Sequence, residues 1–201
     1  MNEEKVSTPI EQTPPGEVKK STFKEIVKEV IIFAIIAFGI VLPFRMYIAE
    51  PYVVDGRSMD PTFATGDYLI VNKFSYIKGD PIRNTVLVFK YPNDTSKNFI
   101  KRVIGLPGET VVMKDDVVTI INDEHPEGFV IDQSYVTYKM PGNFTKKLAN
   151  DEFFVMGDNR AESFDSRSWG PLEKKYILGK PILRLLPITN IGILPGDDSK
   201  L

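Results

Sequence analysis

The sequence contains one uninterrupted apolar run, Val30–Phe44, which carries no charge. Extended to residues 26–49, the segment approaches the roughly 20 residues that a helix needs to cross a bilayer. The charges in this wider window lie toward its ends, where long side chains can reach the headgroups. A buried core helix would need a polar face, and a cleaved signal peptide would need an A-x-A site after the run; the sequence has neither. The pattern predicts a retained transmembrane helix over 26–49.

The flanking cations predict the orientation of this helix. Positive charges are retained on the cytoplasmic side of a membrane, and more of them precede the run (Lys19, Lys20, Lys24, Lys28) than follow it closely (Arg45, Arg57). We therefore expect a cytoplasmic N-terminal tail without stable structure over 1–25. We expect an external folded domain over 50–195 and a short C-terminal tail over 196–201.

Composition excludes several classes of protein. The 25 Lys and Arg residues against 27 Asp and Glu give a net charge of −2, so a strongly basic nucleic-acid binder is not expected. The absence of Cys excludes disulfides, thiol nucleophiles and iron–sulfur clusters. The single histidine, His125, lies in a polar turn-forming segment, which disfavours zinc hydrolases and Ser-His-Asp triads. Neither D-T-G nor D-S-G occurs, as an aspartic protease would require. No metal or cofactor is expected.

After residue 50 the chain reads as short apolar runs separated by turns, which predicts a mainly β domain. No stretch there keeps a helical period, and the apolar run Pro181–Pro195 is too interrupted for a second span. Lys114–Asp116 is expected to be a hairpin turn. The predicted strands are Tyr52–Val54, Tyr68–Val71, Thr85–Phe89, Phe99–Ile104, Thr110–Met113, Val117–Ile121, Glu152–Met156 and Ile177–Leu185.

Two segments could carry chemistry. In the first, a short strand runs into Gly56, and Ser58 follows before the turn at Pro61. Such a turn can present a hydroxyl beside free backbone N–H groups, although it could also be an ordinary surface turn. In the second, Lys101 lies in a strand of apolar residues. Burial would lower the pKa of its amine and make it a general base. The alternatives are an edge-strand lysine that blocks aggregation or a snorkelling one.

Taken together, four motifs resemble those of type I signal peptidases, the membrane-anchored Ser/Lys proteases, in their short Gram-positive form with one anchor. Gly56–Phe63 matches S-M-x-P-T-L with Phe in place of the usual Leu, and Lys101–Gly108 matches K-R-V-I-G-x-P-G. Gly157–Arg167 matches G-D-N-x-x-x-S-x-D-S-R, and Asp67–Lys73 matches the remaining strand motif. The resemblance implies a single transmembrane helix followed by a β-rich catalytic domain of coiled antiparallel sheets.

The resemblance also implies roles for residues. Ser58 would be the nucleophile and Lys101 the general base of a serine endopeptidase that cleaves signal peptides from exported preproteins after A-x-A sites. Ser163 would orient the lysine, and Asp158, Asp165 and Arg167 would brace the site. The oxyanion would be held by the backbone N–H of Ser58. Some family members have a serine donor at the position of Gly56, and here the Gly56 backbone or a water molecule would replace it. The implied pocket consists of Tyr52, Val54, Met59, Phe63, Phe99 and Ile100. The implied partners are signal peptides, the lipid bilayer and the secretion translocon, and no nucleic acid.

Two rival functions remain. A membrane-anchored β domain that only binds a partner would predict a broken dyad, yet Ser58, Lys101 and Ser163 are all present. A self-cleaving Ser/Lys repressor would share the chemistry, but it gives no reason for the apolar run, and no DNA-binding module is recognisable.

Overall fold

The computed structural model describes residues 23–41, 49–76 and 79–196, and the chain divides into two units between Val41 and Leu42. In the first unit, helix α1 (Phe23–Ile36) continues into a π-helical turn, η1 (Ala37–Val41). The helix begins at Phe23, within the predicted tail. None of the helices in the described ranges combines the length and the apolar character that a membrane crossing requires. Residues 42–48 of the predicted span, and predicted tail residues 1–22 and 197–201, lie outside the described residues.

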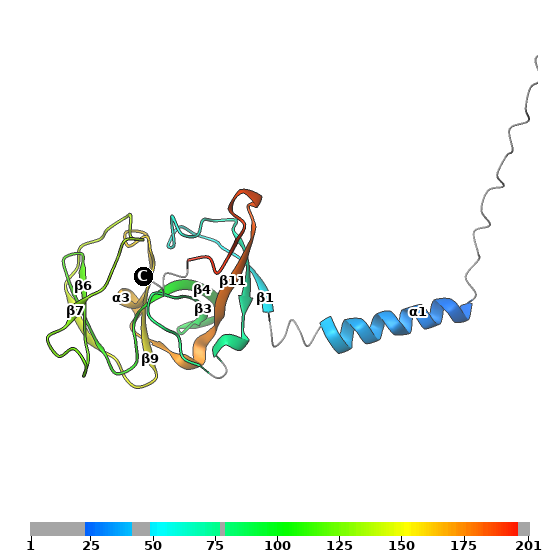
Figure 1. Cartoon of the computed structure of the whole chain (residues 1–201), viewed down its shortest axis with the longest axis horizontal. Helices are drawn as coiled ribbons and strands as arrows, with labels where there is room; N and C mark the ends of the chain where they lie inside the picture. Colours follow the sequence, from blue (N-terminus) through cyan, green and yellow to red (C-terminus); the bar gives the residue numbers. More distant parts are fainter. Residues whose placement is uncertain (1–22, 42–48, 77–78, 197–201) are drawn as a thin grey trace, which may run out of the picture. The chain divides into compact units, whose positions relative to one another are not determined.

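The second unit is built from antiparallel strands in two sheets (Figure 1). The larger sheet has the strand order β1-β2-β11-β3-β4-β9-β10, and β12 pairs with β11. Its strands are β1 (Ala49–Val53), β2 (Tyr68–Asn72), β3 (Val86–Tyr91), β4 (Asp94–Gly105), β9 (Glu152–Met156), β10 (Leu172–Glu173), β11 (Ile177–Leu186) and β12 (Gly192–Ile193). The smaller sheet has the order β7-β6-β5-β8, with β5 (Thr110–Lys114), β6 (Val117–Ile121), β7 (Phe129–Val130) and β8 (Phe144–Lys147).

The short helical elements of this unit lie between strands. They are the helix α3 (Ser166–Trp169) and the 3₁₀ turns η2 (Phe74–Tyr76), η3 (Lys174–Tyr176) and η4 (Ile188–Asn190). The prediction of a mainly β fold with an N-terminal helix is therefore confirmed. The Lys114–Asp116 hairpin is confirmed too: Lys114 pairs with Val117, and Asp115 adopts a φ of 54° that the turn requires.

Strand β4 positions the site because both of its faces are buried at its C-terminal end. Successive side chains of a strand point to opposite faces, so Val103 and Ile104 enter different core clusters. Val103 packs with Leu87, Phe89 and Phe153, whereas Ile104 packs with residues of the smaller sheet. Lys101 and Arg102 lie in the same buried stretch, with exposed fractions of 4% and 0%. Both charged side chains are thereby held inside the domain.

Candidate active site

A cleft of about 270 Å³ opens between β1 and the middle of β4. It is lined by Tyr52–Ser58, Leu69, Val88, Asn98–Lys101, Glu162 and Phe164. β1 pairs only with β2, and residues Asn98–Ile100 pair only with β3, among the described strands. The cleft therefore lies between two strand edges whose backbone groups have no ladder partner on that side.

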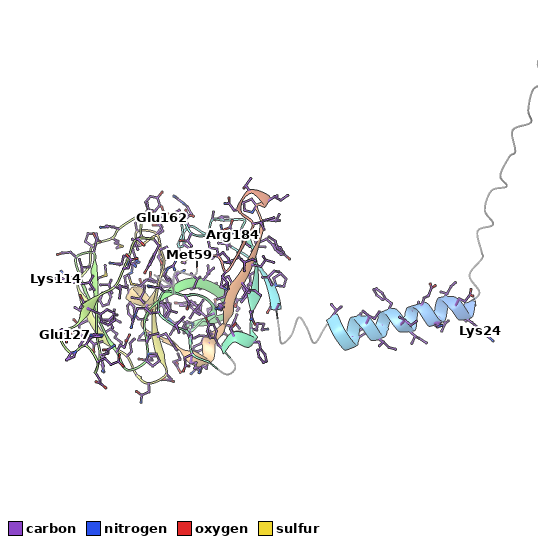
Figure 2. The ribbon with its side chains drawn as sticks, viewed as in Figure 1. Lys24, Met59, Lys114, Glu127, Glu162 and Arg184 are labelled. Carbon is purple, nitrogen blue, oxygen red and sulfur yellow. The ribbon has the colours of Figure 1, made fainter. Side chains whose placement is uncertain are left out.

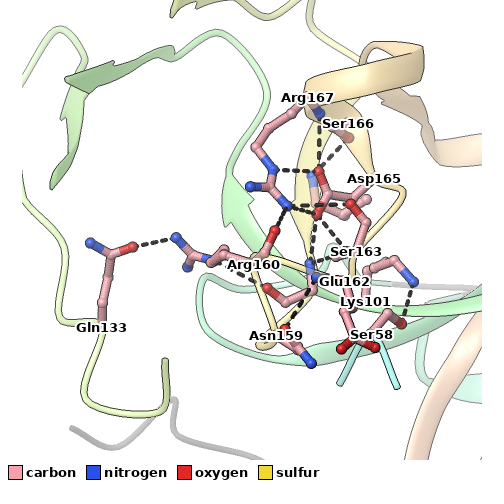
Figure 3. A network of polar contacts seen from close by, with 12 residues as sticks. Ser58, Lys101, Gln133, Asn159, Arg160, Glu162, Ser163, Asp165, Ser166 and Arg167 are labelled. Carbon is pink, nitrogen blue, oxygen red and sulfur yellow. Dashed lines mark hydrogen bonds and ion pairs between the residues drawn. The ribbon is translucent and has the colours of Figure 1, made fainter. Parts of the chain in front are cut away.

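Ser58 and Lys101 both line this cleft and lie side by side (Figure 3). The Lys101 Nζ atom lies 2.8 Å from Ser58 Oγ and donates to the Ile100 carbonyl at 3.0 Å. Nζ also lies 5.2 Å from the centre of the Phe99 ring. A strand thus fixes the amine, and a turn brings the hydroxyl to it. When the amine is neutral, its lone pair can accept the hydroxyl hydrogen at this distance.

Burial changes the acidity of the Lys101 amine. The side chain is withdrawn from water, and this desolvation lowers the pKa of Lys101 to about 8. The carboxylates of Asp165 and Asp158 oppose the shift, because negative charge favours the protonated amine. The burial of Lys101, on which the hypothesis of a general base depends, is present in the structure. About one amine in ten is then neutral at pH 7, which suffices for it to act as a base.

The residues from Gly56 to Phe63, here called the Ser58 turn, fold back on themselves below the cleft. The Phe63 N–H donates to the Met59 carbonyl at 2.9 Å, so the side chains of both residues point the same way, into the core. They pack with Val54, Leu69 and Val86 and are almost completely buried. Figure 2 places Met59 within the body of the domain and Glu162 at its periphery. Met59 and Phe63, which the resemblance implied for the pocket, are buried and are not among the residues that line the cleft, whereas Tyr52, Val54, Phe99 and Ile100 are.

Gly56 starts the Ser58 turn with a φ of 97°, a conformation that favours glycine. Its N–H donates to Thr65 Oγ1, and the same hydroxyl donates to the Gly56 carbonyl, each at 3.1 Å. The Gly56 N–H, which was expected as an oxyanion donor, is therefore already hydrogen-bonded to a side chain. The Ser58 N–H, in contrast, has no acceptor among the described residues.

The segment from Gly157 to Arg167 borders the site (Figure 3). It carries the residues that the resemblance implied for orienting the lysine and bracing the site, namely Asp158, Ser163, Asp165 and Arg167. Asp165 and Arg167 form an ion pair at 2.8 Å. Burial alone would raise the pKa of Asp165, but Arg167 and the Ser163 hydroxyl hold it below its usual value. Gly157 packs so closely that a Cβ atom there would lie 2.3 Å from both the Ser163 hydroxyl and the Ser58 carbonyl.

Ser163 has a different partner from the one that the resemblance implied. Its hydroxyl donates to Asp165 Oδ2 at 2.6 Å and accepts from the Gly157 N–H at 3.1 Å. No hydrogen bond joins Ser163 to Lys101, although both residues lie in the described part of the chain. The nearby Asp165 carboxylate is a stronger acceptor than the amine, so the hydroxyl turns to it.

Asp158 joins the Ser58 turn, through Thr62, to Arg102 of strand β4. Arg102 donates to both Asp158 oxygens, at 2.8 and 2.6 Å, and both side chains are fully buried. Asp158 Oδ2 also accepts from Thr62 Oγ1 at 2.6 Å, and the neighbouring Asn159 N–H donates to the Ser58 carbonyl at 3.0 Å. The strand that carries Lys101 and the turn that carries Ser58 are thereby joined by one charged network.

Three residues that line the cleft, Arg57, Glu162 and Phe164, were not predicted as site residues from the sequence. Arg57 and Glu162 form an exposed ion pair at 3.1 Å that links the Ser58 turn to the 157–167 loop. Phe164 is 52% exposed, and its ring meets Tyr91 edge-on. The sequence signal for this side of the cleft is an aromatic residue, Phe164, among the polar residues of the Gly157–Arg167 motif.

Comparison with known proteins identifies relatives of this chain. Residues 27–186 match the family described as "Signal peptidase, peptidase S26". "Signal peptidase I P" of Bacillus subtilis subsp. natto is 37% identical over 179 residues, which covers 86% of this chain and 94% of that protein. "Signal peptidase I" of Leptolyngbya laminosa is 35% identical over 201 residues, covering 93% and 94%. The crystal structure of a signal peptidase I from Enterococcus faecalis V583 gives a TM-score of 0.44 with 28% identity, over 51% of this chain and 97% of that one.

The two relatives cover most of the chain, and the family match over residues 27–186 includes the segments that form the cleft. The chain therefore belongs to the signal peptidase I family (peptidase S26), the serine endopeptidases that cleave signal peptides from preproteins.

Proposed function

We propose that Ser58 is the nucleophile and Lys101 the general base of this signal peptidase. The observation that carries the proposal is the 2.8 Å contact between a buried amine and a hydroxyl that both line the cleft. Ser58 Oγ attacks the carbonyl carbon of the scissile bond while its proton passes to the neutral Lys101 amine. The protonated amine then gives this proton to the departing amine of the mature protein. This leaves the signal peptide as an ester on Ser58.

Water completes the cycle. The Lys101 amine, neutral again after the first step, takes a proton from a water molecule that attacks the ester carbonyl. The proton returns to Ser58 Oγ as the signal peptide leaves. The Ser58 N–H is the backbone donor that supports the oxyanion of both tetrahedral intermediates. Gly56 would join it only by giving up its hydrogen bond to Thr65 Oγ1.

The apolar residues that line the cleft support a specificity for small side chains. An extended peptide between β1 and Asn98–Ile100 would pair with the two unpartnered edges as an added strand. Its side chains would meet Val54, Phe99 and Ile100, which line the same cleft as Ser58 and Lys101. Such a pocket admits Ala and rejects larger side chains by overlap. We therefore infer cleavage after small residues at the first and third positions before the bond.

The N-terminal segment supports a membrane location. Proteins of the signal peptidase I family are membrane-bound. We propose that residues 26–49 anchor this chain by a single pass, with the N-terminus cytoplasmic and the catalytic domain outside. Since a preprotein's apolar segment is itself in the bilayer, tethering raises the concentration of the enzyme near the bond. The bilayer and the secretion translocon are then its neighbours.

The proposed specificity is tested with the full-length chain in detergent micelles and a preprotein that carries one A-x-A site. We expect a single cut directly after the second Ala, located by mass spectrometry of the new N-terminus. Replacing that Ala with Phe in the preprotein is expected to lower the rate by at least about 100-fold, because a benzyl group overlaps the pocket wall. The Ser58→Ala enzyme serves as the blank. Equal cleavage of the Phe substrate, or a cut elsewhere, would refute the proposed pocket.

A further inference from the structure

The end of the described chain folds back onto the domain after the segment that matches the family. Residues Gly192–Gly196, here called the C-terminal strap, follow the family match, which ends at residue 186. β12 at the start of the strap pairs with Leu183 and Arg184 of β11, and the Leu194 N–H donates to the Ile182 carbonyl at 2.9 Å. The strap is therefore fixed along β11 and not free in solvent.

Gly196 brings the strap against the Ser58 turn. A Cβ atom at this position would lie 2.8 Å from Cε2 of Phe63 and 2.9 Å from Cγ2 of Thr62. The Phe63 ring is completely buried, so it has no space to withdraw. The φ of Gly196 is 72°, a conformation that L side chains rarely adopt. Both the space and the backbone therefore demand glycine, at a position outside the family's matched segment.

The strap is also part of the charged network that joins the two halves of the dyad. The Gly196 carbonyl accepts a hydrogen bond from Arg102 Nη1 at 2.7 Å. The other guanidinium nitrogens of Arg102 hold Asp158, which accepts from the Thr62 hydroxyl. From Gly196 to Thr62 each link is a hydrogen bond of 2.8 Å or less.

A neighbouring contact from β11 acts on the same residues. Arg184 Nη2 donates to the Thr62 carbonyl at 2.6 Å, and its guanidinium lies 4.8 Å from the centre of the Phe63 ring. Figure 2 marks Arg184 on the strand from which the strap continues. Thr62 is therefore held at its carbonyl by Arg184 and at its hydroxyl by Asp158.

We propose that the C-terminal strap is a positioning element for the nucleophile. It fixes Arg102, and through Asp158 and Thr62 it fixes the turn that presents Ser58 to Lys101. No residue of the strap is among those that line the cleft, so the strap acts on the rate of acylation and not on substrate binding. A shift of about 1 Å in a reacting group can change a rate about 100-fold. The inference rests on the proposed role of Ser58.

The test uses Gly196→Ala and Gly196→Val in the full-length chain, with single-turnover cleavage of the A-x-A preprotein at several enzyme concentrations. We expect the maximal rate to fall at least about tenfold for Val and less for Ala, with the half-saturating concentration within about twofold of wild type. Gly142→Val is the matched control, because a Cβ atom there meets nothing closer than Met113 Cε at 3.9 Å. Its kinetics should equal those of wild type.

Thermal unfolding followed by near-UV circular dichroism separates positioning from simple loss of fold. If Gly196→Val unfolds at the assay temperature, the milder Gly196→Ala variant decides. A wild-type rate in a folded Gly196 variant would overturn the proposal, as would a fall that only matches the unfolded fraction. A change confined to the half-saturating concentration would also overturn it. Failure of the proposed function would give a different result. In that case the wild-type enzyme would not cleave the preprotein, or the Ser58→Ala variant would still cleave it.

Discussion

Lys101→Met is expected to abolish cleavage and, at neutral pH, to make the folded domain more stable. Activity should fall by about 10⁴-fold or more, because no other base lies within hydrogen-bond distance of Ser58 Oγ among the described residues. Stability should rise because Met fills a similar volume without a charge to desolvate. The wild-type domain holds this amine at 4% exposure, with its pKa lowered from 10.5 to about 8.

The sign of the stability effect follows from proton binding. Below about pH 8 the amine is protonated in both states, and the folded state carries the full desolvation cost, at most about 3 kcal/mol at about 1.36 kcal/mol per pKa unit. Between about pH 8 and 10.5 the unfolded chain binds more protons, so wild-type stability rises with pH. The advantage of Lys101→Met, about 1–3 kcal/mol at pH 7 after the lost hydrogen bonds are counted, should shrink over that window.

Chemical denaturation of the full-length chain at pH 7 and pH 10 measures the effect. Lys90→Met is the matched control, since Lys90 is an exposed lysine on the neighbouring strand β3 and its replacement should change neither activity nor stability by a comparable amount. Ser58→Ala should be equally inactive without the pH-dependent gain. Cleavage that survives in Lys101→Met would refute the dyad, and a variant that is less stable than wild type at pH 7 would refute the desolvation argument.

Breaking the buried pair of Arg102 and Asp158 is expected to have the largest destabilising effect. Neither side chain is exposed to solvent, so removing one partner leaves a charge that water cannot reach. Asp158→Ala should lower the free energy of unfolding by about 3–5 kcal/mol, and it should also slow cleavage by releasing Thr62 and the Ser58 turn. Urea denaturation of the single variants and of Arg102→Met/Asp158→Ala measures both the loss and the coupling between the residues.

The double variant is expected to be less destabilised than the sum of the single variants, by at least about 1.5 kcal/mol, because it contains no unpaired charge. The exposed pair of Asp94 and Lys97, at 39% and 64% exposure, is the control and should show a coupling below about 1 kcal/mol. Additive losses at Arg102 and Asp158 would contradict the assignment of a desolvated pair.

The sequence predicts a strand well where apolar and polar residues alternate within it and turn-forming residues lie at its ends. Glu152–Met156 has its predicted bounds, and Lys114–Asp116 turns as its composition indicates. Strand β8 (Phe144–Lys147) went unpredicted because its sequence, FTKK, has two lysines and no apolar alternation; it is a strand because it pairs with β5. Such long-range pairing leaves little local signal.

The sequence predicts the site residues whose role depends on the type of side chain. It predicts less well those whose role depends on where the folded backbone points the side chain. Lys101 in an apolar strand signals a base that needs burial, and the structure buries it. Apolar side chains such as Met59 and Phe63 could line a pocket or pack in the core. The path of the Ser58 turn directs both of them into the core. The partner of Ser163 depends on the carboxylate two residues further on. The strap contact at Gly196 has no signal at all in the local sequence.

The pH dependence of acylation tests most directly whether a buried, neutral lysine activates Ser58. Single-turnover cleavage of the A-x-A preprotein by the full-length chain should rise with pH as one group loses its proton, with an apparent pKa of about 8. An inflection near 10.5, the ordinary value for a solvated lysine, or a rate that does not change between about pH 6 and pH 9 would contradict the account.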